Sequence, residues 1–160
     1  MIVRRAGLAD AAGMTGVQNT VIRIGGTTAY EVERTVDQVA ADYLTGADAL
    51  CAHVAIEAGR VIGFQVLGAN PDLPQGWCDI GTFVQPGLQR GGVGAALFAA
   101  TQGWARAQGI VTLNATIRAD NTVGLGYYAK RGFVNYATEP DLTLKDGRVV
   151  GRISTRFDLI

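Results

Sequence analysis

The chain has 160 residues, about the length of one domain, and 48% of them are hydrophobic against 18% charged, as in soluble globular proteins. Its 14 Lys and Arg balance 14 Asp and Glu, so it lacks the basic surface expected of a nucleic-acid binder, and its charge gives no reason to expect a membrane partner. With one serine (Ser154), one histidine (His53) and two cysteines (Cys51 and Cys78), the chain has no G-x-S-x-G turn and too few ligands for a four-cysteine or histidine-rich zinc site.

Hydrophobic periodicity in the first half predicts a strand, two helices and a hairpin. The helices follow from apolar residues spaced three or four apart, and the hairpin from two apolar runs around an Ala-Gly-Arg turn. The expected bounds are a strand at 2–5, helices at 8–21 and 36–44, and hairpin strands at 51–57 and 61–67.

The second half predicts two more strand–helix pairs and a final hairpin. Pro71 and Pro74 make 68–76 a loop, and Asp146-Gly147 is a strong hairpin turn. The expected bounds are strands at 77–84 and 110–117, helices at 91–108 and 121–131, and hairpin strands at 133–144 and 149–159. Alternating strands and helices with no linker indicate one α/β domain over residues 1–160, a mixed sheet covered by helices.

Glycine is over-represented, with 22 residues, and its densest cluster lies where the strand at 77–84 leads into the long helix. Such a turn lets backbone N–H groups converge on a phosphate at the positive end of a helix. A P-loop needs a lysine that is not there, and a dinucleotide fingerprint needs a small residue where Leu97 stands. Tight turns and close packing would also explain the glycines, so the cluster alone leaves its role open.

A second motif changes this interpretation. The run Gln-Arg-Gly-Gly-Val-Gly at 89–94 and the run Asn-Thr-Val-Gly-Leu-Gly-Tyr-Tyr-Ala-Lys-Arg-Gly-Phe at 121–133 together resemble the GCN5-related N-acetyltransferase (GNAT) family. The order of elements from Ile2 to about Leu144 is also that family's. Asn19, Thr28-Ala29 and the strand at 77–86 look closest to its amino-acid and phosphinothricin N-acetyltransferase branch.

The resemblance implies a sheet with helices on both faces, whose two central parallel strands splay apart to hold acetyl-CoA. The splayed strands would be 77–84 and 110–117. The backbone of Phe83 and Val84 would pair with the pantetheine arm, and an N–H near Val84 would polarise the thioester carbonyl. The remaining acetyl-CoA contacts implied are the backbone N–H groups of Gln89, Arg90, Gly91, Gly92, Val93 and Gly94 for the pyrophosphate, and Asn121 for the CoA arm.

The resemblance also implies direct acetyl transfer to an amine, with Tyr128 as the proton donor to the CoA sulfur. Asp79 stands where the branch carries a glutamate base, and because residues 79, 81 and 83 share a strand face, it could point along the same groove. Glu31 is the second candidate for the base or for an acceptor-site residue. Packing on the sheet is the alternative role of Tyr128, and we expect His53 to be a packed or surface histidine.

The acceptor is the least determined part. We expect a small primary amine, an amino acid or an analogue of one, and Arg23 and Arg118 could bind its carboxylate, although ion pairing or solvent exposure explains each arginine better. A non-catalytic acyl-CoA sensor and a protein or peptide N-acetyltransferase are the alternative functions. We expect a cytoplasmic protein without a metal, two buried free thiols and, by resemblance, a homodimer.

Overall fold

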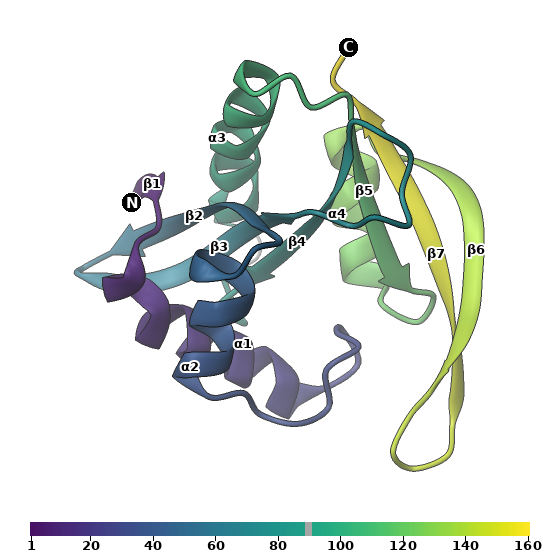
Figure 1. Ribbon diagram of the computed structural model, residues 1–160. Helices are drawn as coiled ribbons and strands as arrows, with labels where there is room; N and C mark the ends of the chain where they lie inside the picture. The colour runs from purple at the N-terminus through teal and green to yellow at the C-terminus, as the bar shows by residue number, and fades with distance from the viewer. Residues whose placement is uncertain (89–90) are drawn as a thin grey trace.

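The computed structural model describes residues 1–88 and 91–160, and in this part of the chain a seven-stranded sheet is covered by four α-helices (Figure 1). The strands are β1 (Ile2–Arg5), β2 (Ala49–Glu57), β3 (Arg60–Gly68), β4 (Trp77–Val84), β5 (Thr112–Arg118), β6 (Val134–Thr143) and β7 (Val149–Asp158). The helices are α1 (Ala11–Ile24), α2 (Val36–Ala40), α3 (Val93–Ala107) and α4 (Thr122–Arg131).

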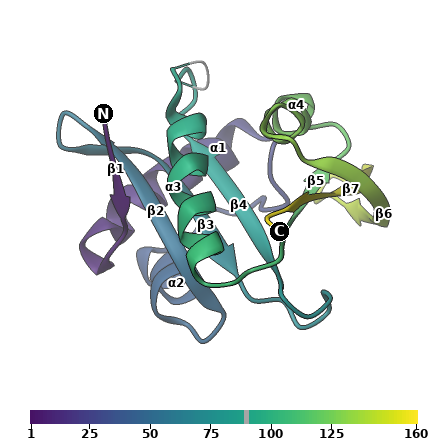
Figure 2. The ribbon, with the colours of Figure 1, turned by 90° about the horizontal axis from the view of Figure 1, so that it is seen from above.

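The strand order in the sheet is β1-β2-β3-β4-β5-β7-β6, and β4 with β5 is its parallel pair, whereas the other neighbours are antiparallel. Helix α3 lies on one face of the sheet and α1 and α2 lie on the other, as the two views show (Figures 1 and 2). The expected α/β class, mixed sheet and helices on both faces are confirmed.

Alternation along β4 divides the core between the two faces. Cys78 and Ile80 pack with Phe98 of α3 and Tyr128 of α4. Phe83, of the opposite parity, packs against the cluster formed by α1 and the inner strands around Phe64. Side chains of β4 with even numbers therefore face α3 and α4, and those with odd numbers face α1 and α2.

Two helices differ from the sequence prediction. The first begins with a 3₁₀ turn at Leu8–Asp10 and continues to Ile24. Asp10 is buried in that turn because its carboxylate accepts hydrogen bonds from Arg4 at 2.8 and 2.9 Å and from the N–H of Gly7 at 2.8 Å. The second helix changes at Ala41–Thr45 into a π-helical turn.

The central parallel pair opens after three residues. Trp77, Cys78 and Asp79 pair with residues 112–114 of β5. Beyond Asp79, β4 stays paired with β3 as far as Val84, and β5 stays paired with β7 as far as Arg118. The two strands therefore part while each keeps its outer neighbour, which is the expected splay.

Within the part of the chain that the structure describes, no helix is both long and apolar enough to cross a membrane.

Candidate functional site

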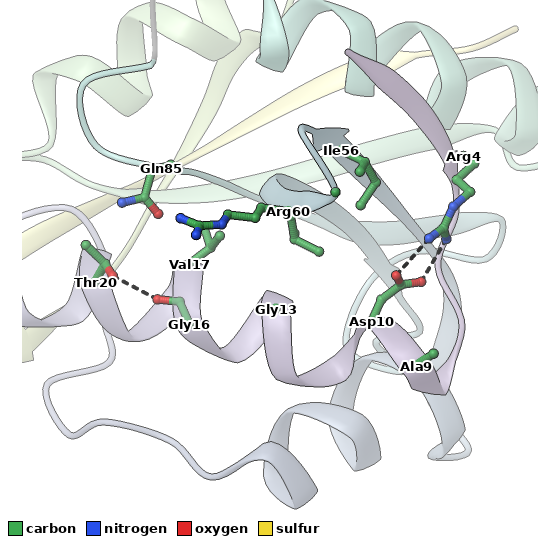
Figure 3. Close-up of a pocket in the computed structure, with 12 residues that line it drawn as sticks. Arg4, Ala9, Asp10, Gly13, Gly16, Val17, Thr20, Ile56, Arg60 and Gln85 are labelled. Atoms are coloured by element: carbon green, nitrogen blue, oxygen red, sulfur yellow. Dashed lines mark hydrogen bonds and ion pairs between the residues drawn. The ribbon is translucent and has the colours of Figure 1, made fainter.

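The opening between β4 and β5 leads into a cavity of about 1280 Å³. Its walls come from the splayed strands, the start of α3, α4 and the loop after α1. A second cavity, of about 740 Å³, lies between α1 and the β2–β3 hairpin (Figure 3). Its Arg4 and Asp10 form an ion pair, which leaves Arg60 as its other charged group. The larger cavity adjoins the strand opening and is lined by Lys130, Arg131 and Arg152, so it is the better candidate for an anionic ligand.

The backbone of β4 presents unpaired hydrogen-bonding groups to this opening. The N–H of Gln85 donates to the carbonyl of Ile62 on β3 at 2.8 Å. Because successive residues of a strand direct their backbone groups to opposite sides, the groups of Thr82 and Val84, beyond the last paired residue Asp79, face the gap. The backbone groups of Phe83 face β3, so Thr82 and Val84, rather than Phe83 and Val84, present backbone groups to the opening. The phenyl ring of Phe83 still lines the cavity.

The glycine cluster ends at the first turn of α3. Gly92 is the residue before the helix and has the left-handed φ of 78° that glycine tolerates best. Among the residues that the structure describes, none lies within 4 Å of a Cβ added at Gly92, and Gly92 lines the cavity. Gly94 also lines the cavity, and the first turn of α3 carries no acidic residue. Of the expected phosphate contacts, Gln89 and Arg90 lie outside the described residues.

The first turn of α3 is held from beneath by Tyr127. The hydroxyl of Tyr127 donates to the carbonyl of Gly94 at 2.8 Å, and a Cβ at Gly94 would lie only 2.6 Å from Cε2 of the Tyr127 ring. Gly94 is buried and is therefore needed for close packing against this ring. This role of Tyr127 could not be predicted from the sequence, since a contact across 33 positions leaves no local pattern.

Tyr128 lines the cavity from α4, with its hydroxyl 2.8 Å from that of Thr82 on β4. Burial raises the pKa of Tyr128 above its ordinary value of 10, so the phenol keeps its proton at neutral pH. A buried, protonated hydroxyl beside the strand opening can donate a proton to a group in the cavity.

Asp79 lies at the closed end of the opening, where β4 and β5 still pair. Its carboxylate accepts hydrogen bonds from the side-chain amides of Asn70 at 2.8 Å and Asn114 at 2.7 Å. Asp79 faces the α1 and α2 side of the sheet, opposite to Tyr128. Polar side chains continue from it across β5, β7 and β6, namely Asn114, Thr116, Ser154, Glu139 and Tyr136, through hydrogen bonds between neighbours.

Asn121 and Arg118 fasten the loop after α1 to the rest of the site. Asn121 caps α4 by accepting the N–H of Gly124 at 2.8 Å, and its amide donates to the carbonyl of Thr27 at 2.9 Å. Arg118 binds both carboxylate oxygens of Asp120 and donates to the carbonyl of Thr28 at 3.0 Å. Ion pairing, rather than a free carboxylate site, is therefore the role that the structure gives Arg118.

Glu31 and Arg23 lie farther along the same part of the chain. Glu31 is exposed, and its carboxylate accepts the backbone N–H of Lys145 in the β6–β7 turn at 2.9 Å. Arg23 forms an exposed ion pair with Glu33, as the alternative interpretation expected. Glu31 thus joins the loop after α1 to the β6–β7 turn.

His53 and the cysteines are packed in the core. His53 is 5% exposed, with Nδ1 3.2 Å from the hydroxyl of Thr101, and burial lowers its pKa. Cys51 and Cys78 are free and buried, and burial raises their thiol pKa values to about 11 and about 12. The predictions of a packed histidine and of two free thiols are confirmed. No group of three potential metal ligands occurs among the residues that the structure describes.

Three basic side chains at the cavity were not predicted from the sequence. Lys130 and Arg131 line it from the last turn of α4, and the guanidinium of Arg131 lies 5.5 Å from the centre of the Tyr127 ring. Arg152 lines it from β7. Lys130 and Arg131 were part of the downstream motif, so their positive charge at the end of a helix was the available signal. Arg152 stands in the final hairpin, outside both motifs.

Comparisons with known proteins agree with this geometry. A family model described as "Acetyltransferase (GNAT) family" matches residues 25–133. No curated protein sequence matches the chain. The structure of an N-acetyltransferase from Staphylococcus aureus Mu50 is similar with a TM-score of 0.87 at 22% identity, over 99% of this chain and 98% of that one.

Two further structures carry acetyl-CoA. The putative acetyltransferase yncA from Salmonella typhimurium, with its cofactor acetyl-CoA, is similar with a TM-score of 0.86 at 23% identity, over 100% of this chain and 94% of that one. A phosphinothricin acetyltransferase from Sinorhizobium meliloti, in complex with acetyl-CoA, has a TM-score of 0.84 at 20% identity, over 98% of this chain and 87% of that one. At these identities the likeness establishes the shared fold.

Proposed function

The chain belongs to the acetyltransferase (GNAT) family, whose members use acetyl-CoA, and on this premise we propose that it transfers an acetyl group directly to the primary amine of a small molecule, an amino acid or close analogue. The observation that carries the proposal is the opening between β4 and β5. There, unpaired backbone groups of one strand and the first turn of α3 face the same cavity. A strand-like pantetheine arm and a pyrophosphate fit those two features in turn.

The phosphates of CoA would lie at the start of α3. The backbone from Gly92 to Gly94 offers N–H groups and the positive end of the helix, whereas the N–H of Gly91 is already bonded to the carbonyl of Leu88 at 3.0 Å. Lys130 and Arg131 add positive charge from α4. Along the arm, the N–H of Val84 faces the gap where the thioester carbonyl would lie. One such donor aimed at a developing oxyanion contributes about 3–4 kcal/mol to transition-state stabilisation.

Acetyl transfer requires a neutral amine and a protonated leaving group. Tyr128, buried and protonated, would donate its proton to the CoA sulfur as the carbon–sulfur bond breaks. Asp79 would accept the amine proton from the opposite face of the opening, through a water, because both of its oxygens are already hydrogen-bonded to amides. Glu31, bonded to the β6–β7 turn, is the second candidate for the acceptor side.

Arg152 supports an acceptor that carries a carboxylate. Its Nε donates to the carbonyl of Pro140 at 2.9 Å, and within the described residues its two Nη atoms have no hydrogen-bond or ion-pair partner. A guanidinium with both outer nitrogens available at the cavity is suited to bidentate binding of a carboxylate.

Release of the CoA thiol from acetyl-CoA, measured across amino acids, phosphinothricin, methionine sulfoximine, polyamines, an aminoglycoside and N-terminal peptides, tests the proposal. We expect amine-dependent release with the amino acids or their analogues, and a KM for them about tenfold higher or more in Arg152→Gln, with the KM for acetyl-CoA unchanged. Release only with peptides would assign a protein acceptor. If no amine causes release of the CoA thiol while acetyl-CoA still raises the melting temperature, the result would favour a non-catalytic acyl-CoA sensor.

The proposal includes the homodimer and the cytoplasmic location expected from the sequence. Strand β6 forms one edge of the sheet, and the final hairpin carries exposed Val134, Tyr136 and Val149. These apolar side chains beside an unpaired strand edge support contact with a second copy. Sedimentation equilibrium tests it, and a monomer at assay concentrations would contradict it.

A further inference from the structure

A buried chain of hydrogen bonds runs beneath the cavity floor from the start of α3 to Tyr128. It links side chains from β3, β4 and α4. Gln65 of β3 is fully buried, and its Nε2 lies 2.9 Å from the hydroxyl of Thr82 and 3.1 Å from that of Tyr127. The hydroxyls of Thr82 and Tyr128 are 2.8 Å apart. The proposed transfer uses the backbone of Thr82, but it uses neither the hydroxyl of Thr82 nor the side chain of Gln65.

The donor-to-acceptor direction of these hydrogen bonds is set at the end that contacts α3. The carbonyl of Gly94 can only accept, so the single proton of Tyr127 is committed to it at 2.8 Å. The oxygen of Tyr127 must then accept from Gln65, which places Nε2 of that amide toward both hydroxyls. With the amide reversed, its oxygen would face the oxygen of Tyr127 instead. In the present orientation, Oε1 of Gln65 is buried without a hydrogen-bond partner in the described part of the chain.

The hydrogen bond from Gln65 makes Thr82 the donor in its contact with Tyr128. Its oxygen accepts from Nε2 of Gln65, which leaves its own proton for the oxygen of Tyr128 at 2.8 Å. If Tyr128 donated instead, the proton of Thr82 would be left with the oxygen of Tyr127, which already accepts from Gln65. With Thr82 as the donor, the proton of Tyr128 is free to point into the cavity, which both residues line.

We propose that Gln65 and Thr82 are positioning residues that turn the hydroxyl proton of Tyr128 toward the leaving sulfur. The inference rests on the proposed function and on Tyr128 as its proton donor. As the carbon–sulfur bond breaks, the O–H bond of Tyr128 breaks and an S–H bond forms. The phenolate left on Tyr128 accepts the hydrogen bond from Thr82 until water returns a proton. Thr82 therefore acts twice, first by orienting the proton and then by stabilising the charge that its departure leaves.

The unpartnered amide oxygen of Gln65 indicates that packing alone does not explain an amide at this position. A buried polar atom without a partner destabilises a fold, and an apolar side chain of the same volume would avoid that loss. Gln65 shares its strand face with Leu67, which packs into the apolar cluster under α3. An amide at this position thus lowers stability and at the same time orients two hydroxyls at the cavity.

Thr82→Val removes the donor and keeps the shape, and Thr82→Ser keeps the donor. We expect kcat of Thr82→Val to fall about ten- to hundredfold, since a hydrogen bond to a charged group is lost from the transition state. The KM for acetyl-CoA should stay within about twofold, and Thr82→Ser should recover most of kcat. Gln65→Met, which frees Thr82 to accept from Tyr128, should lower kcat in the same way.

The decisive comparison is a double-mutant cycle with Tyr128→Phe. If Thr82 acts through Tyr128, then Thr82→Val has no further effect on kcat once Tyr128 is phenylalanine. An equal fall of kcat in both backgrounds would overturn the inference and leave the transfer reaction standing. Normal turnover by Tyr128→Phe alone would overturn both the inference and the role of Tyr128, whereas the amine panel tests the proposed function itself.

A matched control separates positioning from stability. Thr101 is fully buried in α3 and bonds to His53, away from the cavity. Thr101→Val should therefore lower the melting temperature without lowering kcat. If Thr101→Val and Thr82→Val reduce kcat alike, the fall reports loosened packing and the inference is wrong.

Discussion

Replacing Gly94 with alanine tests whether Tyr127 fixes the start of α3. The new Cβ would lie 2.6 Å from Cε2 of the ring and 3.3 Å from Cδ2 and Cζ, whereas carbon atoms in contact are normally about 3.5–4.0 Å apart. The ring must therefore move by roughly 1 Å at its near edge. It cannot do so freely, because its hydroxyl bonds to Gly94 and to Gln65 and its face packs against Tyr128.

Overpacking of this kind typically destabilises by about 1–3 kcal/mol, and losing the hydroxyl bond adds about 1 kcal/mol. The gain from replacing a helical glycine offsets about 0.5–1 kcal/mol. The net expectation for Gly94→Ala is a loss of about 2 kcal/mol, or about 6 °C in melting temperature for a chain of this size. Circular dichroism measures it, and acetyl-CoA titration should show weaker binding.

Two variants make this result interpretable. Gly103 lies in the same helix, and a Cβ there would meet nothing within 4 Å, so Gly103→Ala should leave the melting temperature unchanged or raise it. In a Tyr127→Leu background the steric part of the Gly94→Ala effect should disappear. If Gly94→Ala melts like Gly103→Ala, or if its loss persists without the Tyr127 ring, the contact does not fix α3.

Two further outcomes follow from buried polar groups. Asn121→Ala should lower stability by about 1–2 kcal/mol through loss of the α4 cap and should weaken acetyl-CoA binding by releasing Thr27, whereas Asn121→Asp keeps the capping oxygen and most of the stability; equal melting temperatures of the two variants would contradict this. Burial lowers the pKa of His53 below its ordinary 6.5, so the unfolded chain binds more protons at this residue than the folded chain does. The contribution of His53 to the free energy of unfolding should therefore be fully present above about pH 6.5 and should be lost as the pH falls below that value. Urea denaturation at several pH values measures this, and the same slope in His53→Gln would refute it.

The strands and helices around the site could be predicted because their signals are local. Proline and glycine bound the segment 77–84, so β4 was predicted with the bounds it has in the structure. Asn121 precedes an apolar periodic segment and caps α4 as such a residue should. The splay was implied by the resemblance, since no local pattern distinguishes a strand that loses its partner after Asp79 from one that keeps it.

The polar contacts of the site could not be predicted, because they join residues far apart in the chain. Arg118 was weighed as a carboxylate ligand, but Asp120 two positions later binds it. Tyr127 and Tyr128 are adjacent in sequence, yet one hydroxyl holds α3 and the other meets Thr82 on β4. Asp10 pairs with Arg4 of β1 from within the 3₁₀ turn that precedes α1, a contact that no local pattern indicates.

The most direct test of the account compares acetyl-CoA binding by Gly92→Asp and Gly92→Asn, measured by calorimetry. The two side chains have nearly the same shape, both tolerate the left-handed φ of 78° at this position better than other residues do, and both would enter open space. They differ in one negative charge at the proposed pyrophosphate site. The account predicts that Gly92→Asn binds acetyl-CoA more weakly than the unmodified protein and that Gly92→Asp does not bind it. Equal affinities of the two variants would contradict the placement of the pyrophosphate at the start of α3.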